Sequence, residues 1–257
     1  RDLHSFPTRR SSDLHSLAIS NAAFPQLTER LGEGRLDLFQ KDLRSLLRII
    51  FWMALPTSVV IFFTRGYIVH FIRNTGDQLM AGILGCLVVA ILFRTIYHMA
   101  ARAFYARQDT KTPLYISVFS ISLNIALAII LTMNLNMGAY GLAWAQSTVA
   151  VFEVVILLLV MSKQMPRMFN RAFVKAIGKM IAASAVAGVV CYIGVSVMPF
   201  RDTDSSFFSA FPKFTIISIV SFGVYLLMSK LLRLPEVDPI LKKGKKLLFG
   251  RLDGVWR

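Results

Sequence analysis

The amino-acid sequence predicts an all-α polytopic membrane protein with six transmembrane helices, on three observations. Hydrophobic residues make up 55% of its 257 residues. The mean hydropathy of +0.59 is higher than a soluble domain carries without exposing large apolar patches. Only 17% of the residues are charged, and they fall almost entirely between the apolar stretches. A lipid bilayer imposes this separation, because a charged side chain inside hydrocarbon is costly.

Six apolar runs are long enough to cross about 30 Å of hydrocarbon, which takes on the order of 20 residues. They lie near residues 46–64, 79–101, 113–133, 138–161, 174–198 and 214–232. Pro56 lies inside the first run, where it removes one backbone hydrogen bond and predicts a bend in the helix. In a transporter such a bend is either a hinge for alternating access or a static feature, and the sequence favours neither.

Residues 1–14 are polar, without helical or strand periodicity, and begin without an initiator methionine. We expect this stretch to be non-native and exclude it from the fold prediction. Residues 15–43 are predicted to hold the end of a preceding helix and a loop. We therefore expect the chain to be the C-terminal part of a longer protein.

Lysine and arginine side chains alternate between rich and poor connections along the chain. The basic segments precede the first run and occupy 102–112, 162–179 and the tail 233–257, whereas 134–137 has no basic residue. Because positive charge collects in cytoplasmic loops, these segments are predicted to be cytoplasmic, together with the C terminus. The tail mixes lysines with leucines and Phe249, which predicts a segment that contacts anionic membrane lipids.

The charge and the cysteines exclude several function classes. The net charge of +15 lies in short loops and a tail rather than on one binding face, so we expect no nucleic-acid partner. Cys86 and Cys191 both lie inside apolar runs, which argues against a disulfide or a thiolate metal site. The chain also lacks the common nucleotide-binding, metalloprotease and hydrolase motifs. We therefore predict no enzyme activity, no catalytic residue, no metal and no cofactor.

The most specific local feature is RAFYARQDTKTP, residues 102–113, in the connection between the second and third runs. Asp109 and Thr110 are predicted to end one helix, and Pro113 to open the next, where its missing N–H breaks no bond. By its spacing alone, the segment is a basic turn that anchors the topology.

The sequence resembles the C-terminal part of the MurJ (MviN) family of lipid II flippases, in the multidrug/oligosaccharidyl-lipid/polysaccharide exporter superfamily. The resemblance rests on AAFPQL at 22–27, on ALP at 54–56, on GAYGLAWAQS at 138–147 and above all on AFYARQDTKTP. It extends from about residue 15 to 161, and more loosely to 232. Its motif residues in the last of these blocks are Phe104, Tyr105, Arg107, Gln108, Asp109, Thr112 and Pro113.

The resemblance implies that the six helices are the last six of a fourteen-helix transporter of the MATE-like type. Residues 44–161 would supply four helices of its second lobe, and 162–232 two C-terminal helices that line a groove for a lipid tail. The implied substrate is an undecaprenyl-pyrophosphate-linked saccharide, lipid II, carried across the bacterial inner membrane for cell wall synthesis, with that synthesis machinery as a partner. The family's cavity arginines in its first lobe have no counterpart in this sequence. A flippase for another polyprenyl-linked polysaccharide precursor and a structural membrane protein are the alternatives.

Charged residues inside the runs are candidates for substrate contact, because such groups are retained in membranes for pairing or function. Arg94 and Glu153 lie about 15 residues from the outer ends of the second and fourth runs, so at about 1.5 Å per residue they sit at similar depth. Either they pair, or Arg94 faces the cavity and contacts the substrate pyrophosphate. His98 lies one turn from Arg94 on the same helix face and extends the basic stripe. Asn124 and Gln146 are predicted to hydrogen-bond between helices.

Overall fold

The computed structural model describes residues 35–73, 77–165, 168–198 and 207–237, and every regular element in these ranges is helical. The six predicted membrane-spanning helices are all present, which confirms the predicted fold class. The elements are α3 (Leu36–Arg73), α4 (Gln78–Ala106), α5 (Lys111–Ile129), the π-helical turn η1 (Ile130–Asn134), α6 (Gly138–Gln164), α7 (Arg171–Val197) and α8 (Phe207–Leu231). The predicted non-native stretch 1–14 and the tail from 238 onward lie outside the described residues.

Helix α3 is longer than predicted at both ends. The expected span was 46–64, but the helix has 38 residues, or roughly 57 Å at 1.5 Å per residue. Residues 36–43 are therefore helical and not part of the preceding loop. Arg65, the first residue after the predicted run 46–64, lies inside the helix with its aliphatic stem against Gly85 of α4. Its Nη1 donates to the carbonyl of Phe62, 2.8 Å away, one turn earlier in α3. The packed stem and the hydrogen-bonded guanidinium explain how the charge of Arg65 is accommodated within α3.

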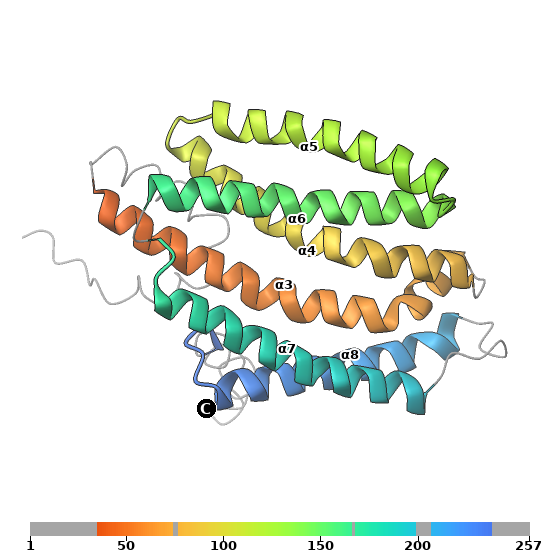
Figure 1. The fold of residues 1–257 in the computed structure, drawn as a ribbon. Coiled ribbons are helices and arrows are strands. Elements are labelled where there is room, and N and C mark those ends of the chain that lie inside the picture. Colours follow the sequence, from red (N-terminus) through yellow and green to blue (C-terminus); the bar gives the residue numbers. More distant parts are fainter. Residues whose placement is uncertain (1–34, 74–76, 166–167, 199–206, 238–257) are drawn as a thin grey trace, which may run out of the picture.

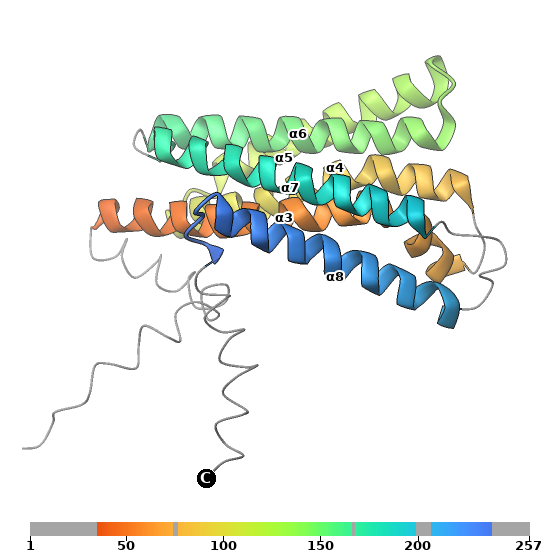
Figure 2. The same ribbon diagram turned by 90° about the horizontal axis from the view of Figure 1, so that it is seen from below.

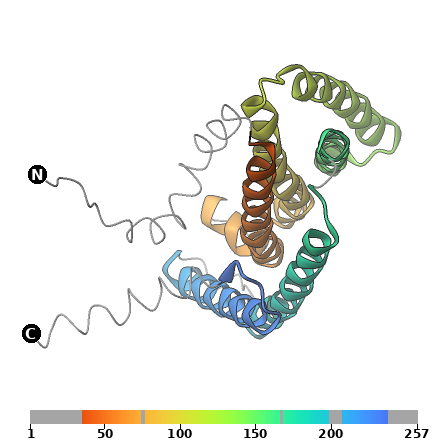
Figure 3. The ribbon, with the colours of Figure 1, turned by 90° about the vertical axis from the view of Figure 1, so that its left-hand side faces the viewer.

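Helix α3 is the centre of the bundle. It packs against α4 on one side and against α7 and α8 on the other, while α6 packs on α4 and α5 packs on α6 (Figure 1). Figure 2 shows α6 and α8 on opposite sides of α3. Viewed end-on in Figure 3, α5 forms one edge of the molecule and α8 the other. The C-terminal helix pair therefore contacts the remaining helices through α3.

The four segments predicted to be cytoplasmic gather at one end of the bundle. The start of α3, the α4–α5 connection, the α6–α7 connection and the end of α8 all lie on the left in Figure 1. Side-chain contacts join these segments to one another. Arg44 Nε donates to the carbonyl of Met168, 2.9 Å away, and Arg107 Nη1 donates to Gln164 Oε1, 2.7 Å away. The described parts of these basic segments thus lie at the same end of the fold.

The buried core lies along the seams between helices and leaves much of the outer surface apolar. The largest cluster joins α3, α4, α6 and the start of α7 around Leu43, Phe104 and Leu157. On α5, by contrast, successive large apolar side chains are exposed: Leu114, Tyr115, Val118, Phe119, Ile121 and Ile125. A continuous face of this kind would aggregate in water, so it fits contact with hydrocarbon. The protein is a multi-pass membrane protein.

Helix α5 ends in the π-helical turn η1, against which α6 begins. Asn136 and Gly138, with φ angles of 51° and 55°, reverse the chain between the two helices. At Gly141 a Cβ atom would lie 2.8 Å from the carbonyl carbon of Leu131 and 3.0 Å from the amide nitrogen of Thr132. Only glycine allows this close backbone approach. The GAYG sequence at 138–141 is thus explained by local geometry.

Candidate functional site

The first half of the RAFYARQDTKTP segment ends α4 with a Schellman motif. Gln108 adopts the left-handed conformation, with a φ angle of 59°. Its N–H donates to the carbonyl of Tyr105, and the N–H of Asp109 donates to the carbonyl of Phe104, each at 3.0 Å. These are the two bonds that define the motif, which satisfies carbonyl groups at the end of a helix. Helix α4 therefore ends at Ala106, three residues earlier than Asp109.

Asp109 opens α5 rather than ending α4, which corrects the sequence prediction. Its Oδ1 accepts the backbone N–H of Thr112 at 3.1 Å, and its Oδ2 accepts the hydroxyl of Thr112 at 2.7 Å. Such capping satisfies an amide at the first turn, where no helical carbonyl is available. The first helical bond of α5 runs from Leu114 N–H to Thr110 O, so Pro113 breaks no bond there, as predicted. These hydrogen bonds lower the pKa of Asp109 below its usual range.

Replacing Asp109 by alanine is expected to lower the stability of the protein by about 1 kcal/mol, because an amide of α5 loses its cap. The matched control is Thr110→Ala, since the Thr110 side chain makes no capping hydrogen bond. Because the pKa of Asp109 is lower in the folded state, its contribution is present above about pH 4 and is lost as the pH falls through the lowered value. Thermal unfolding of the detergent-solubilised protein at pH 7 measures the difference. Equal midpoints for the two variants would contradict the capping role.

The other residues of this segment hold helix ends together. Phe104 is fully buried in the largest core cluster, whereas the neighbouring Tyr105 is exposed. Arg107 bonds to Gln164 and so joins the end of α4 to the end of α6. The segment therefore has a structural function: it ends α4, begins α5 and joins the end of α4 to the end of α6. Its interpretation as a basic turn that anchors the topology stays a prediction.

Arg94 and His98 lie on an exposed face of α4, one helical turn apart, and Arg102 follows one turn later and is also exposed. The three side chains form what we call the α4 stripe. Sequence reasoning placed Arg102 in the loop and missed it as a member, although its spacing of four residues from His98 was the signal. Their exposure leaves the two guanidinium groups and the imidazole accessible to an anionic headgroup.

Glu153 of α6 lies behind this stripe and is 6% exposed. The carboxylate is under the electrostatic influence of Arg94 and lies beside Ser117 of α5, whose hydroxyl is hydrogen-bonded to Tyr97 of α4 at 2.6 Å. Arg94 and Glu153 do not form an ion pair within 4.0 Å in the described residues. In the structure a buried acid therefore attracts an exposed cation without direct contact, and substrate contact by Arg94 stays a prediction.

The polar groups inside α5 and α6 form helix–helix contacts, as the sequence predicted. Asn124 Nδ2 donates to Gln146 Oε1. Ser147 of α6, which sequence reasoning missed, donates its hydroxyl to the carbonyl of Cys86 in α4 at 2.6 Å. These bonds join three helices along the seam that also holds Glu153. Among the described residues, no group of three or more His, Cys, Asp or Glu side chains is arranged to hold a metal ion.

Comparison with known proteins identifies one family. Residues 12–212 match the model of the family described as "Lipid II flippase MurJ". A protein of Thermotoga maritima named "Probable lipid II flippase MurJ" is 27% identical over 237 residues, covering 90% of this chain and 45% of the relative. A protein of the same name from Borreliella burgdorferi is 24% identical over 155 residues, which is 58% of this chain and 30% of the relative.

The fold has a match among solved structures. The structure described as "Lipid II flippase MurJ, inward closed conformation" superimposes with a TM-score of 0.65 at 23% identity, covering 85% of this chain and 43% of that one. The chain thus spans less than half the length of the curated relatives it matches and of this structure.

Proposed function

The chain belongs to the lipid II flippase MurJ family, whose model matches residues 12–212, and from this membership we propose that it works as part of a lipid II flippase. This family consists of transporters rather than enzymes. The proposed substrate is the undecaprenyl-pyrophosphate-linked peptidoglycan precursor. Its headgroup crosses the bacterial inner membrane by alternating access while its tail stays in lipid, and no covalent bond is made or broken. The observation that carries the proposal is the family match over the region that holds five of the six spans completely.

Within this function the α4 stripe is the proposed contact for the substrate pyrophosphate. Arg94, His98 and Arg102 present donors at intervals of one helical turn on an exposed face. A phosphate group binds arginine donors strongly because hydrogen bonds between oppositely charged groups are shorter and stronger than those between neutral groups. Glu153 attracts Arg94 electrostatically from its buried position on α6. The proposed substrate path therefore follows α4 toward the basic end of the bundle.

The proposed orientation puts the basic end of the bundle in the cytoplasm, and with it the C terminus. Its support is that the described parts of the four basic segments lie at one end (Figure 1), whereas the opposite end has no basic residue between Asn134 and Gly138. Helices α7 and α8 are the proposed groove for the lipid tail. Enzymes of cell wall synthesis are the partners that this function predicts. Reaction of single cysteines at the exposed positions Lys163 and Asn136 with a membrane-impermeant thiol reagent tests the orientation, since only Asn136→Cys should react in intact cells.

The test of the substrate site is growth complementation in a strain depleted of its own flippase. The full-length protein carries Arg94→Ala, Glu153→Ala or both, with Lys175→Ala, an exposed cation of α7, as the matched control. Substrate contact predicts that Arg94→Ala abolishes growth while Glu153→Ala and Lys175→Ala leave growth close to wild type. If the double variant grows better than either single one, the two residues stabilise each other and do not bind substrate. Wild-type growth of all the variants would exclude both roles.

Substrate identity is tested in reconstituted vesicles. The full-length protein should expose labelled lipid II to an external reagent faster than protein-free vesicles do. A polyprenyl-pyrophosphate carrying a saccharide without the peptide is the competing substrate. Faster translocation of that competitor than of lipid II would favour a flippase for another polysaccharide precursor, and translocation of neither would favour a structural protein.

A further inference from the structure

Pro56 leaves a gap in the hydrogen-bond ladder of α3. It is buried within a helix that continues without interruption from Leu36 to Arg73. In a regular helix the amide of residue 56 would donate to the carbonyl of residue 52. Proline has no amide hydrogen, so the carbonyl of Trp52 loses its helical partner. An unpaired carbonyl inside a membrane is energetically costly because no water can hydrogen-bond to it, so the gap needs another donor.

The donor comes from α8. The hydroxyl of Tyr225 donates to the carbonyl of Trp52 at 2.7 Å, in a buried environment. One turn later on α8, Ser229 Oγ accepts the indole Nε1–H of Trp52 at 3.3 Å. The rings of Trp52 and Tyr225 also pack together, with centroids 5.6 Å apart. Two successive turns of α8 therefore hold the residue that faces the gap.

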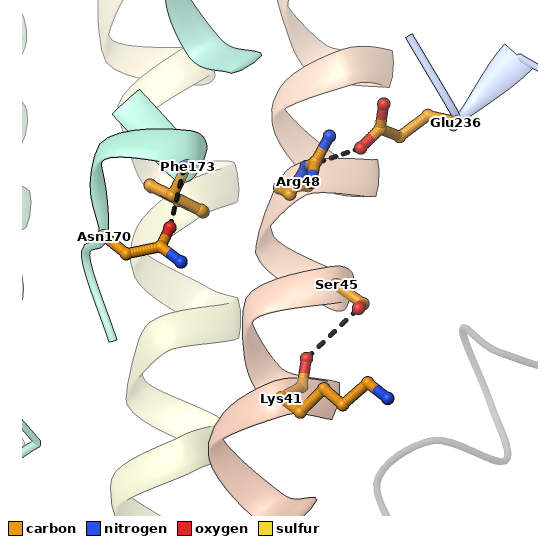
Figure 4. A network of polar contacts seen from close by, with 6 residues as sticks. All are labelled: Lys41, Ser45, Arg48, Asn170, Phe173 and Glu236. Atoms are coloured by element: carbon orange, nitrogen blue, oxygen red, sulfur yellow. Dashed lines mark hydrogen bonds and ion pairs between the residues drawn. The ribbon is translucent and has the colours of Figure 1, made fainter. Parts of the chain in front are cut away.

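The end of α8 is itself fastened to α3 and α7 beyond this point. Glu236 Oε1 forms an ion pair with Arg48 Nε at 2.6 Å (Figure 4). Lys179 of α7 donates to the carbonyl of Leu232 at 2.9 Å. Arg48, Trp52 and Pro56 follow one another at intervals of four residues, so they lie on one face of α3. The contacts with α8 thus run along the face of α3 that contains the gap.

We propose that Tyr225 is a positioning residue whose hydroxyl replaces the amide missing at Pro56, so that α8 sets the shape of α3 at that point. A change in the bend of α3 at Pro56 moves the carbonyl of Trp52, and therefore requires the Tyr225 hydrogen bond to break. Through this contact the C-terminal helix α8 restrains the bend of the central helix α3. The inference concerns α3 and α8 alone and holds whichever lipid is transported.

A double-mutant cycle between Tyr225→Phe and Pro56→Ala tests the proposal in the full-length protein. Tyr225→Phe keeps the ring and removes the donor, so the midpoint of thermal unfolding should fall by about 4 °C. Alanine at position 56 restores the amide and satisfies the carbonyl of Trp52 within the helix, so Tyr225→Phe should then have less than half that effect. The control is Tyr192→Phe, a tyrosine exposed on α7, which should shift neither background. An equal shift in the two backgrounds, or none in the presence of Pro56, would overturn the proposal.

If Pro56→Ala does not fold, a distance measurement along α3 tests the same proposal. Spin labels at the exposed positions Lys41 and Ile72 report the end-to-end distance of α3, in a background in which Cys86 and Cys191 are replaced by serine. The distance distribution should be narrow in the parent protein and in Tyr192→Phe, and broader or shifted in Tyr225→Phe. Identical distributions in all three would mean that α8 does not set the shape of α3. Neither measurement reads transport, so failure of the proposed flippase function would leave their outcome unaffected.

Discussion

Replacing Phe104 by alanine is expected to destabilise the protein by about 3–5 kcal/mol, the range for removing a large buried aromatic side chain. Phe104 is 0% exposed and lies in the core cluster that joins α3, α4 and α6. Its carbonyl also accepts the Asp109 amide in the motif that ends α4. The cavity left by alanine would therefore loosen three helices where the α4–α5 connection begins. Thermal unfolding of the purified full-length protein in detergent measures the loss.

The matched control is the next residue, Tyr105→Ala. Tyr105 is 48% exposed and belongs to the same sequence motif. If the motif serves helix packing at Phe104, then Tyr105→Ala should change the unfolding midpoint little. If the two variants destabilise the protein equally, then burial of the Phe104 side chain is not the stabilising contribution of this motif. The amount of each variant in the membrane fraction is measured as well, because a variant that is unstable but correctly targeted is still found there.

Replacing Gly141 by alanine is expected to destabilise the protein by about 1–3 kcal/mol, and to lower its yield in the membrane, since extra atoms in a tightly packed site force the backbone to move. The new Cβ atom would lie 2.8 Å from a backbone atom of Leu131. A backbone atom in the π-helical turn cannot rotate away as a side chain can. The first turn of α6 must therefore move away from η1.

Gly178→Ala is the matched control for this substitution. Gly178 lies within α7, and a Cβ atom there would meet nothing within 4 Å. Alanine has a higher helix propensity than glycine, so this variant should keep or slightly raise the unfolding midpoint. The two glycine-to-alanine changes therefore have opposite expected signs. A midpoint for Gly141→Ala at or above the parent value would disprove the close approach of α6 to η1.

Helix number and type could be predicted because they depend on local composition. Each apolar run is long enough to span the membrane by itself, and in hydrocarbon its backbone polar groups must be satisfied within the helix. Helix ends were less predictable. The first helix extends over Leu36–Arg73, beyond the predicted apolar run, and its added first turns pack Leu43 into the core. The predicted run stopped before Arg65 because a charge usually marks a membrane boundary, but the stem of Arg65 packs on Gly85 and its guanidinium has a partner in its own helix.

The candidate site was predictable in its residue types but not in its arrangement. Depth along two helices suggested that Arg94 and Glu153 are neighbours, but rotation about the helix axes decides whether two such side chains touch. The structure brings Glu153 into the core and leaves Arg94 exposed. Spacing alone cannot supply that rotation, because each helix presents a different face to each neighbour. The contribution of Arg102 to the α4 stripe emerged only when the helix was seen to continue to Ala106.

The sequence by itself determined that the chain crosses the membrane six times, which segments are basic and which family motif it contains, because these features are written in consecutive residues. Only the tertiary structure decided which side chains and backbone groups bond to one another between helices. Sequence alone showed that Pro56 removes a donor, whereas the replacement donor, Tyr225, lies 169 positions further along the chain. No local pattern connects the two residues, since a hydrogen bond between helices depends on how the helices pack and not on their separation in sequence.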